Sequence, residues 1–108
     1  MEEISREELK TKLDRGDDFK LVMTLAEWAY MVSHIPGSIN VNNINQGERL
    51  LDIDDEIVVY CSDEHCVASQ ATYHYLVRNG YKNVRRYSGG LADWEAAGYP
   101  LEGQAHQN

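Results

Sequence analysis

Two cysteines five positions apart are the residues of this chain best suited to covalent chemistry. Cys61 and Cys66 enclose the segment Ser62-Asp63-Glu64-His65. A thiolate is a nucleophile, and a pair of thiols can also take part in disulfide exchange. Since Cys61 follows an apolar run and Cys66 precedes a helical pattern, we expect residues 61–66 to form a short reactive loop between a strand and a helix.

The elements on either side of the loop favour a reactive thiolate at Cys61. Ile57-Val58-Val59-Tyr60 is a β-branched and aromatic run typical of a strand covered on both faces. The helix expected to begin near Val67 would point its positive end toward the loop, whose amides could surround the sulfur. Both effects would also favour a persulfide anion or a bound oxyanion. An inert, buried core thiol is the alternative interpretation of Cys61.

A metal site is not expected in this segment. His65 could act as an acid–base group or pair with a thiolate, but a solvated loop residue is the favoured interpretation. A structural zinc site usually needs two spaced pairs of ligands, and Cys61, His65 and Cys66 lack a second pair. We therefore expect no metal and no other cofactor.

Five further side chains are assigned roles outside the loop. His34 is expected to brace the turn before the following proline. Arg85 and Arg86 end the last predicted strand, and alternation turns them to opposite faces, so one of them could supply positive charge at the rim of the site. Solvation of both side chains is the favoured interpretation. Trp28 and Trp94 occupy helical apolar positions and are predicted to lie in the core.

Strand and helix signals alternate along the chain. Capping boxes at 5–8 and 24–27 predict the starts of two helices, and Gly16 the end of the first. Strands are expected at 19–23, 38–41, 57–60 and 83–87, and further helices at 67–79 and from Gly89 onward. This order predicts a three-layer α/β fold, with a mainly parallel central sheet flanked by helices on both faces. Ligands of such sheets bind at the carboxyl ends of the strands, where Cys61 is expected.

Length and charge limit the classes of function. The 108 residues suit a single domain over 1–108, ordered from about 4 to 101, with 103–108 as a loose polar tail. A formal net charge of −8 argues against nucleic-acid and anionic-membrane partners. No stretch approaches the roughly 20 apolar residues of a membrane span, and the acidic N-terminus is unlike a signal peptide. We therefore expect a cytoplasmic protein whose cysteines remain thiols or act in redox or transfer chemistry.

Several segments resemble the rhodanese-like domain family, and they occur in that family's order. Residues 34–41, His-Ile-Pro-Gly-Ser-Ile-Asn-Val, are similar to its HIPGAIN segment. Residues 57–61 are similar to the strand that leads to its active cysteine. The segments 80–84, 87–94 and 97–100 resemble its C-terminal third. The resemblance extends from about Ser5 to Leu101 and implies the rhodanese-like fold.

The resemblance implies a sulfurtransferase. A small-molecule or protein-bound donor would give its outer sulfur to Cys61, forming a persulfide, and a thiol or other nucleophilic acceptor would remove it. Backbone amides would hold the persulfide or the anionic group of the donor. The amides that the resemblance assigns to this role belong to Ser62, Asp63, Glu64, His65 and Cys66. The sequence identifies no partner protein.

Three features depart from the family's pattern. The common loop has an arginine five residues after the cysteine, where this chain has Cys66, and the usual loop glycine is Glu64. The Asp-x-Arg pair after the second strand is replaced by Met23 and Leu25. A loop arginine would pair with an anionic donor such as thiosulfate, whereas Asp63 and Glu64 would repel it. We therefore expect a neutral or protein-bound donor.

Cys66 allows a second chemistry. Its thiol could resolve a Cys61 persulfide, releasing sulfide and leaving a disulfide. The favoured interpretation is that Cys66 only packs at the helix start, because a rigid loop could hold the two sulfur atoms apart. The alternative functions are a non-catalytic rhodanese-like binding or regulatory module and a Cys61/Cys66 dithiol redox protein. A cysteine phosphatase is disfavoured because no arginine lies between Cys61 and Arg78.

Overall fold

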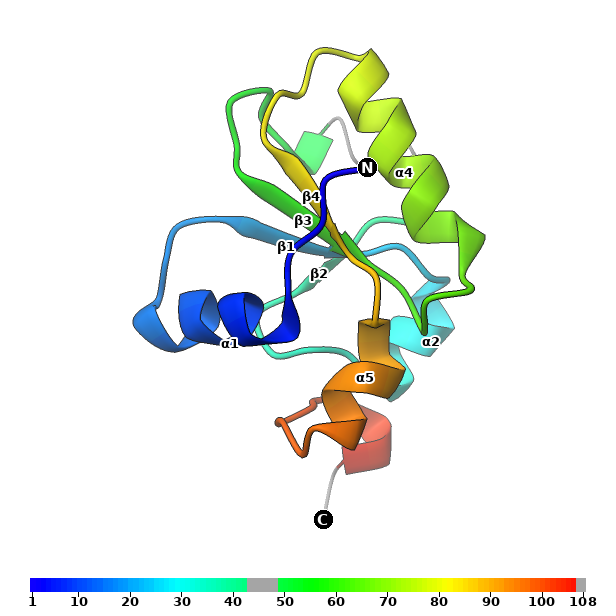
Figure 1. Cartoon of the computed structure of the whole chain (residues 1–108). Helices are drawn as coiled ribbons and strands as arrows, with labels where there is room; N and C mark the ends of the chain where they lie inside the picture. The colour runs from blue at the N-terminus through cyan, green and yellow to red at the C-terminus, as the bar shows by residue number, and fades with distance from the viewer. Residues whose placement is uncertain (43–48, 107–108) are drawn as a thin grey trace.

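A four-stranded parallel sheet forms the centre of the molecule in a computed structural model that describes residues 1–42 and 49–106. The strands are β1 (Lys20–Met23), β2 (Ile39–Asn40), β3 (Ile57–Tyr60) and β4 (Val84–Tyr87). Their order is β2-β1-β3-β4, so β3 pairs on both sides (Figure 1). The predicted parallel α/β fold is confirmed.

Helices cover both faces of the sheet. They are α1 (Arg6–Arg15), α2 (Glu27–Val32), α4 (Val67–Arg78) and α5 (Gly90–Ala96), followed by a 3-10 turn, η1 (Gln104–His106). Figure 1 shows α4 on one side of the sheet and α1 with α5 on the other.

Alternation along β3 builds the two halves of the core. Val58 and Tyr60 pack in the cluster that contains Leu9 of α1 and Trp94 of α5. Ile57 and Val59 pack in the opposite cluster, with Tyr73 and Leu76 of α4. All four residues of β3 are buried, as expected for a parallel strand covered on both faces.

The Ser5 half of the first predicted capping box is confirmed, whereas the Glu8 carboxylate accepts from Arg85 and does not reach back to the Ser5 N–H. The Ser5 hydroxyl accepts a hydrogen bond from the Glu8 N–H at 3.0 Å and begins α1. Ile4 and Leu9, on either side of this cap, are both buried. Gly16 ends the helix with φ 72°, a left-handed conformation that glycine adopts without a side-chain clash.

The second predicted capping box is wrong. The residue that precedes α2 is Ala26, and its side chain makes no capping hydrogen bond. Thr24 is buried beside the end of β3, where its N–H and its hydroxyl both donate to the Tyr60 carbonyl, at 3.1 and 3.2 Å. The Thr24 hydroxyl, which the local pattern assigned to the start of α2, is therefore occupied by a hydrogen bond to the neighbouring strand.

Two further predictions, for the burial of Trp28 and for a loose C-terminal tail, are wrong. Trp94 is buried and donates to the Pro100 carbonyl at 2.9 Å, as predicted, but Trp28 of α2 is 73% exposed. Residues 103–106 are not a loose tail, because η1 packs against α2 and the Ser33 hydroxyl lies 2.9 Å from His106 Nε2. Residues 107 and 108 of the predicted tail lie outside the described residues.

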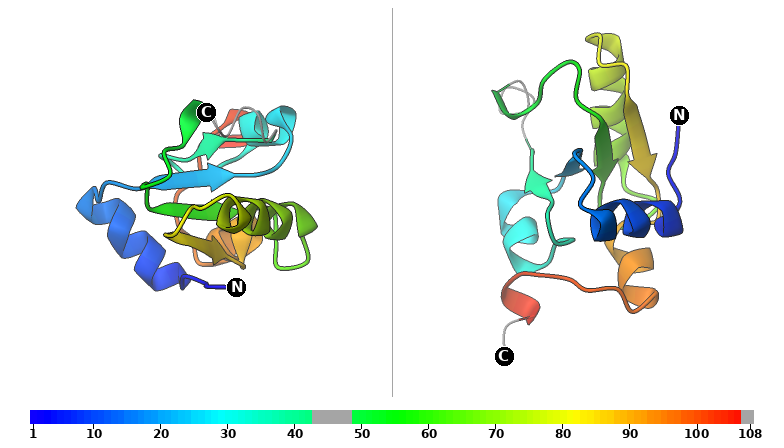
Figure 2. Two further views of the ribbon diagram at one scale, coloured as in Figure 1. Left: turned by 90° about the horizontal axis from the view of Figure 1, so that it is seen from above. Right: turned by 90° about the vertical axis from the view of Figure 1, so that its left-hand side faces the viewer.

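The N-terminal segment pairs alongside β4 and so widens the sheet at that edge. The Ile4 N–H donates to the Arg86 carbonyl at 3.1 Å, and the Arg86 N–H donates to the Glu2 carbonyl at 2.9 Å. Figure 2 shows this segment running beside β4.

Tyr60 connects the end of β3 to the turn after α2. Its hydroxyl accepts from the Ile35 N–H at 3.0 Å and lies 2.9 Å from the Ser38 hydroxyl. Burial raises the pKa of Tyr60 to about 12, although these hydrogen bonds lower it. The phenol therefore stays protonated at neutral pH and can donate to Ser38.

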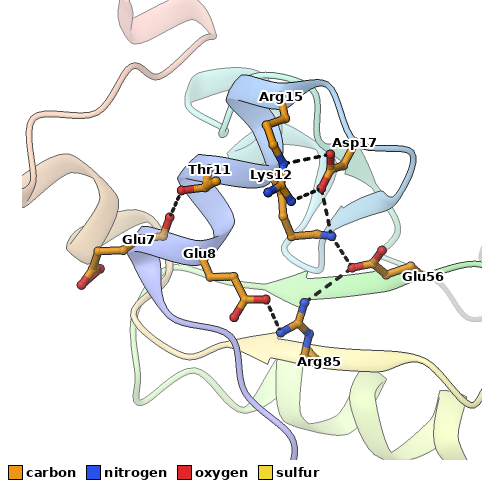
Figure 3. Close-up of polar contacts among 8 residues, drawn as sticks. All are labelled: Glu7, Glu8, Thr11, Lys12, Arg15, Asp17, Glu56 and Arg85. Carbon is orange, nitrogen blue, oxygen red and sulfur yellow. Dashed lines mark hydrogen bonds and ion pairs between the residues drawn. The ribbon is translucent and has the colours of Figure 1, made fainter.

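A buried lysine fastens α1 to the sheet. The Lys12 side chain is 9% exposed, and its Nζ lies 2.6 Å from Glu56 Oε2 and 3.5 Å from Asp17 Oδ2. Glu56 directly precedes β3. Arg85 of β4 contacts the same carboxylate at 3.5 Å and Glu8 of α1 at 2.8 Å (Figure 3). One carboxylate thus links α1, β3 and β4.

We expect Glu56→Gln to lower the free energy of unfolding by about 2 kcal/mol, because it leaves the buried Lys12 ammonium with the more distant Asp17 carboxylate and the Phe19 ring. Urea denaturation of both proteins measures this difference. Glu8→Gln is the control, because Glu8 is exposed and its loss should cost about 0.5 kcal/mol or less. Equal effects of the two substitutions would contradict the assigned role of Glu56.

Candidate active site

The two cysteines lie at opposite ends of one short loop and are joined by a disulfide. Cys61 directly follows β3 and is 1% exposed, whereas Cys66 directly precedes α4 and is half-buried. Their Cα atoms are 6.2 Å apart, within the range that a disulfide spans. The loop therefore does not hold the two sulfur atoms apart, contrary to our expectation from its presumed rigidity.

The start of α5 fixes the first residues of the loop. The Leu91 N–H donates to the Cys61 carbonyl at 3.0 Å, and the Ala92 N–H donates to the Ser62 carbonyl at 2.9 Å. Gly90 has φ 61°, and a Cβ there would lie 2.5 Å from the Cys61 carbonyl oxygen. Glycine is therefore required where α5 meets the loop.

These hydrogen bonds also orient part of the predicted anion site. In a trans peptide the C=O and the following N–H point in opposite directions. Since the carbonyls of Cys61 and Ser62 point at α5, the N–H groups of Ser62 and Asp63 point away from it. They remain candidates for holding a persulfide or an anionic group.

Asp63 organises the second half of the loop. Its Oδ1 accepts from the His65 N–H at 2.9 Å, and its carbonyl accepts from the Cys66 N–H at 3.2 Å. Two of the five amides that we expected to bind an anion are therefore engaged inside the loop in this disulfide form. An anion site in this form depends on the N–H groups of Ser62, Asp63 and Glu64.

The outer side chains of the loop face solvent. Glu64 and His65 are both exposed, and Glu64 Oε1 lies 3.5 Å from His65 Nε2. His65 therefore fits its interpretation as a solvated loop residue. Together with Asp63, Glu64 gives the loop an acidic surface.

A buried arginine approaches the loop from β4. The Arg86 side chain is 6% exposed, and its Nε donates to the Ser69 hydroxyl at 3.0 Å. Its Nη2 donates to the Glu64 carbonyl at 3.2 Å, and its Nη1 lies 3.8 Å from Glu3 Oε1. Arg86 thus joins the loop, the first turn of α4 and the N-terminal segment. The expectation that solvent covers this side chain is wrong.

Strand alternation contains the signal that could have found Arg86. Val84 and Arg86 lie on the face of β4 that α4 covers, whereas Arg85 and Tyr87 lie on the opposite face. Arg85 is also not simply solvated, because it pairs with Glu8 and Glu56. Each arginine is therefore used by a different layer of the structure.

The remaining site predictions concern residues in and after β1 and in the turn before β2. Met23 is buried in β1, and Leu25 packs against the same core cluster, so neither supplies charge beside the loop. His34 braces its turn as predicted: its Nδ1 lies 2.7 Å from the Tyr30 carbonyl oxygen, and its ring stacks on the Tyr30 ring at 3.9 Å.

Two absences hold for residues 1–42 and 49–106. In these residues, no group of three or more His, Cys, Asp or Glu side chains is arranged to hold a metal ion. Over the same ranges, none of the helices is both long enough and apolar enough to cross a membrane.

Comparison with known families agrees with this fold. The model of the Rhodanese-like domain matches residues 5–97. The chain belongs to the rhodanese-like domain family. The family resemblance of the sequence segments is thereby confirmed.

Two curated relatives of this rhodanese-like domain have different names. It is 31% identical to the HTH-type transcriptional regulator Rv0324 of Mycobacterium tuberculosis over 92% of this chain, and it spans 44% of that protein. It is 35% identical to the thiosulfate sulfurtransferase GlpE of Pseudoalteromonas translucida over 64% of this chain and 66% of the relative. The chain therefore spans less than half of the first relative and about two thirds of the second.

Solved structures share the fold along the length of the rhodanese-like domain. The solution structure of the rhodanese-like domain from the Anabaena sp. Alr3790 protein has a TM-score of 0.86 and 26% identity, and covers 100% of this chain and 83% of its own. The crystal structure of BH2092 from Bacillus halodurans also has a TM-score of 0.86, at 22% identity, over 96% of this chain and 78% of that one.

Arg86→Leu should lower the free energy of unfolding by about 2–3 kcal/mol, because the Glu64 carbonyl and the Ser69 hydroxyl lose a buried charged donor. Arg85→Leu is the matched control and should cost about 1 kcal/mol or less, because its ion pairs are partly exposed. Urea denaturation under reducing conditions measures both effects without a contribution from the disulfide. Equal stability of the two variants would contradict the structural role of Arg86.

Proposed function

We propose that this rhodanese-like domain is a sulfurtransferase that carries sulfane sulfur as a persulfide on Cys61. The observation that carries the proposal is the placement of Cys61 at the carboxyl end of the buried central strand, directly before the loop that leads into α4. Relatives named thiosulfate sulfurtransferase, at 35% identity in one case and 36% in another, support sulfur transfer as the reaction.

The reaction begins from the reduced form of the loop. The Cys61 thiolate attacks the outer sulfur of a donor persulfide, and the donor leaves as a thiolate. A thiol or other nucleophile then attacks the outer sulfur on Cys61 and restores the Cys61 thiolate. The N-terminus of the 12-residue helix α4 favours negative charge on the loop in both steps.

The charges around the loop favour a neutral or protein-bound donor. Asp63 and Glu64 place two carboxylates on the loop itself. The nearest buried cation, Arg86, already binds the Glu64 carbonyl and Ser69 and pairs with Glu3. A small dianion such as thiosulfate would meet repulsion without the arginine that this family commonly provides. Donor and acceptor thiols are the partners that we propose, without nucleic acid or membrane.

The disulfide form cannot start this reaction because it has no thiolate at Cys61. We therefore propose that the transferase acts in a reducing compartment, the cytoplasm, where thiols keep the loop open.

Loading of Cys61 tests the proposal directly. Reduced Cys66→Ser protein should gain the mass of one sulfur atom on Cys61 after exposure to glutathione persulfide, and less after 3-mercaptopyruvate or thiosulfate. Intact-protein and peptide mass spectrometry measure the adduct. The Cys61→Ser variant is the control and should gain none. If no donor adds sulfur while iodoacetamide still alkylates Cys61, the sulfurtransferase proposal fails.

Cys66→Arg should improve the use of thiosulfate, because it places a guanidinium where the family commonly has one. A hydrogen bond to a charged group of about 1.5 kcal/mol corresponds to a roughly tenfold faster loading of Cys61 by thiosulfate than in Cys66→Ser. Loading by a neutral alkyl persulfide should change little. Initial rates from quenched mass spectrometry give both values, and equal thiosulfate rates in the two variants would refute the electrostatic explanation.

A further inference from the structure

The Cys61–Cys66 disulfide adds a second reaction to this site. We propose that Cys66 resolves the Cys61 persulfide, so that the domain reduces sulfane sulfur to sulfide and ends in the disulfide form. This inference rests on the proposed function, because it needs a persulfide on Cys61. It assigns to Cys66 a chemical role in place of packing at the helix start.

The geometry of the loop permits the step without movement of the surrounding elements. The disulfide coexists with the hydrogen bonds from α5 to the carbonyls of Cys61 and Ser62, and with the one from the Cys66 N–H to Asp63. It also coexists with the Arg86 contacts to the loop and to α4. Closure of the disulfide is therefore compatible with an intact sheet, an intact α4 and an intact α5.

The composition of the loop favours release of the sulfur as an anion. Two carboxylates, from Asp63 and Glu64, repel hydrosulfide near the loop. The position at which the family commonly holds an anion-binding arginine instead holds the attacking thiol. Cys66 thus takes the place of an anion-binding side chain and also supplies a nucleophile. Because Cys66 lies on the same loop, its attack has the advantage of an intramolecular reaction over attack by an external thiol.

The step balances in atoms and electrons. The Cys66 thiolate attacks the inner sulfur of the persulfide, Cys61 Sγ, and a bond forms between the two cysteine sulfur atoms. The bond between Cys61 Sγ and the outer sulfur breaks, and the electron pair leaves with the outer sulfur as hydrosulfide, which keeps its hydrogen. The outer sulfur gains two electrons, and the two cysteines together lose two.

An external thiol must then reopen the disulfide. Two molecules of a low-molecular-weight thiol, or one dithiol, supply the two electrons and become a disulfide themselves. Cys61 is 1% exposed, whereas Cys66 is half-buried beside Val67, which is 74% exposed. The incoming thiolate therefore meets Cys66 first, forms a mixed disulfide there and releases Cys61 ready for the next donor.

A single-turnover experiment tests the role of Cys66. Reduced protein is mixed without oxygen with one equivalent of glutathione persulfide, and sulfide is trapped with monobromobimane while the protein mass is followed. The native chain should release one equivalent of sulfide and lose two hydrogen atoms. Cys66→Ser should keep the added sulfur on Cys61 and release sulfide at least roughly tenfold more slowly. Cys66→Ala provides a second variant if the serine protein folds poorly.

Val67→Ser is the matched control, because it changes the exposed neighbour of Cys66 and keeps both thiols. It should release sulfide as the native chain does. Added sulfur on Cys66→Ser with an unchanged rate of sulfide release would overturn the role of Cys66 alone. A native chain that keeps the sulfur without forming the disulfide would also overturn it. Absence of added sulfur from Cys61 in both Cys66 variants would instead overturn the proposed sulfurtransferase function.

Discussion

Strand β3 is buried along its whole length and pairs with a neighbour on each side, and the positions of the other elements depend on it. At its amino end, the Glu56 carboxylate joins Lys12 of α1 to Arg85 of β4. At its carboxyl end, the chain turns directly into Cys61 and the reactive loop. A charged network therefore holds one end of the strand, while the other end presents the nucleophile. Displacement of β3 would disturb both.

Arg86 shows how the fold provides positive charge to a loop that has no arginine of its own. The side chain comes from β4, passes beneath α4 and holds the Glu64 carbonyl at 3.2 Å. A buried guanidinium is tolerated only when its hydrogen bonds are satisfied, and here Ser69 and Glu3 complete its environment. This buried charge positions the loop backbone, whereas the exposed surface of the loop is acidic. The cation that holds the loop in place therefore does not make its exposed surface attractive to anions.

Local sequence signals predicted much of the fold. The Ser5 cap, the Gly16 stop and the continuous apolar run of β3 act within a few residues, so their consequences were visible in the chain. The family resemblance then indicated the fold and the place of Cys61. The position of Cys61 at the end of a buried strand could be predicted without knowledge of contacts between distant segments.

The wrong predictions for Thr24 and Arg86 have a common physical cause in contacts between distant segments, whereas those for Trp28 and for the two sulfur atoms have local causes. Thr24 matched a capping box, but the Tyr60 carbonyl, 36 positions later, engages its side chain. Trp28 has helical apolar spacing, yet α2 has only six residues and none of them is buried. The burial of Arg86 depends on α4 covering one face of β4. The closeness of the two sulfur atoms depends on loop geometry that spacing alone does not determine.

The parallel pairing of the N-terminal segment with β4 has a consequence for association. An uncovered edge strand offers free backbone groups to which another chain can add as a further strand. Here residues 2–4 occupy the edge beyond β4, and the opposite edge strand, β2, has only two residues. Within the residues that the structure describes, the sheet thus offers little edge for strand addition by a second protein. If the donor or acceptor that we propose is a protein, this leaves the side chains around the loop, and not a sheet edge, for its docking.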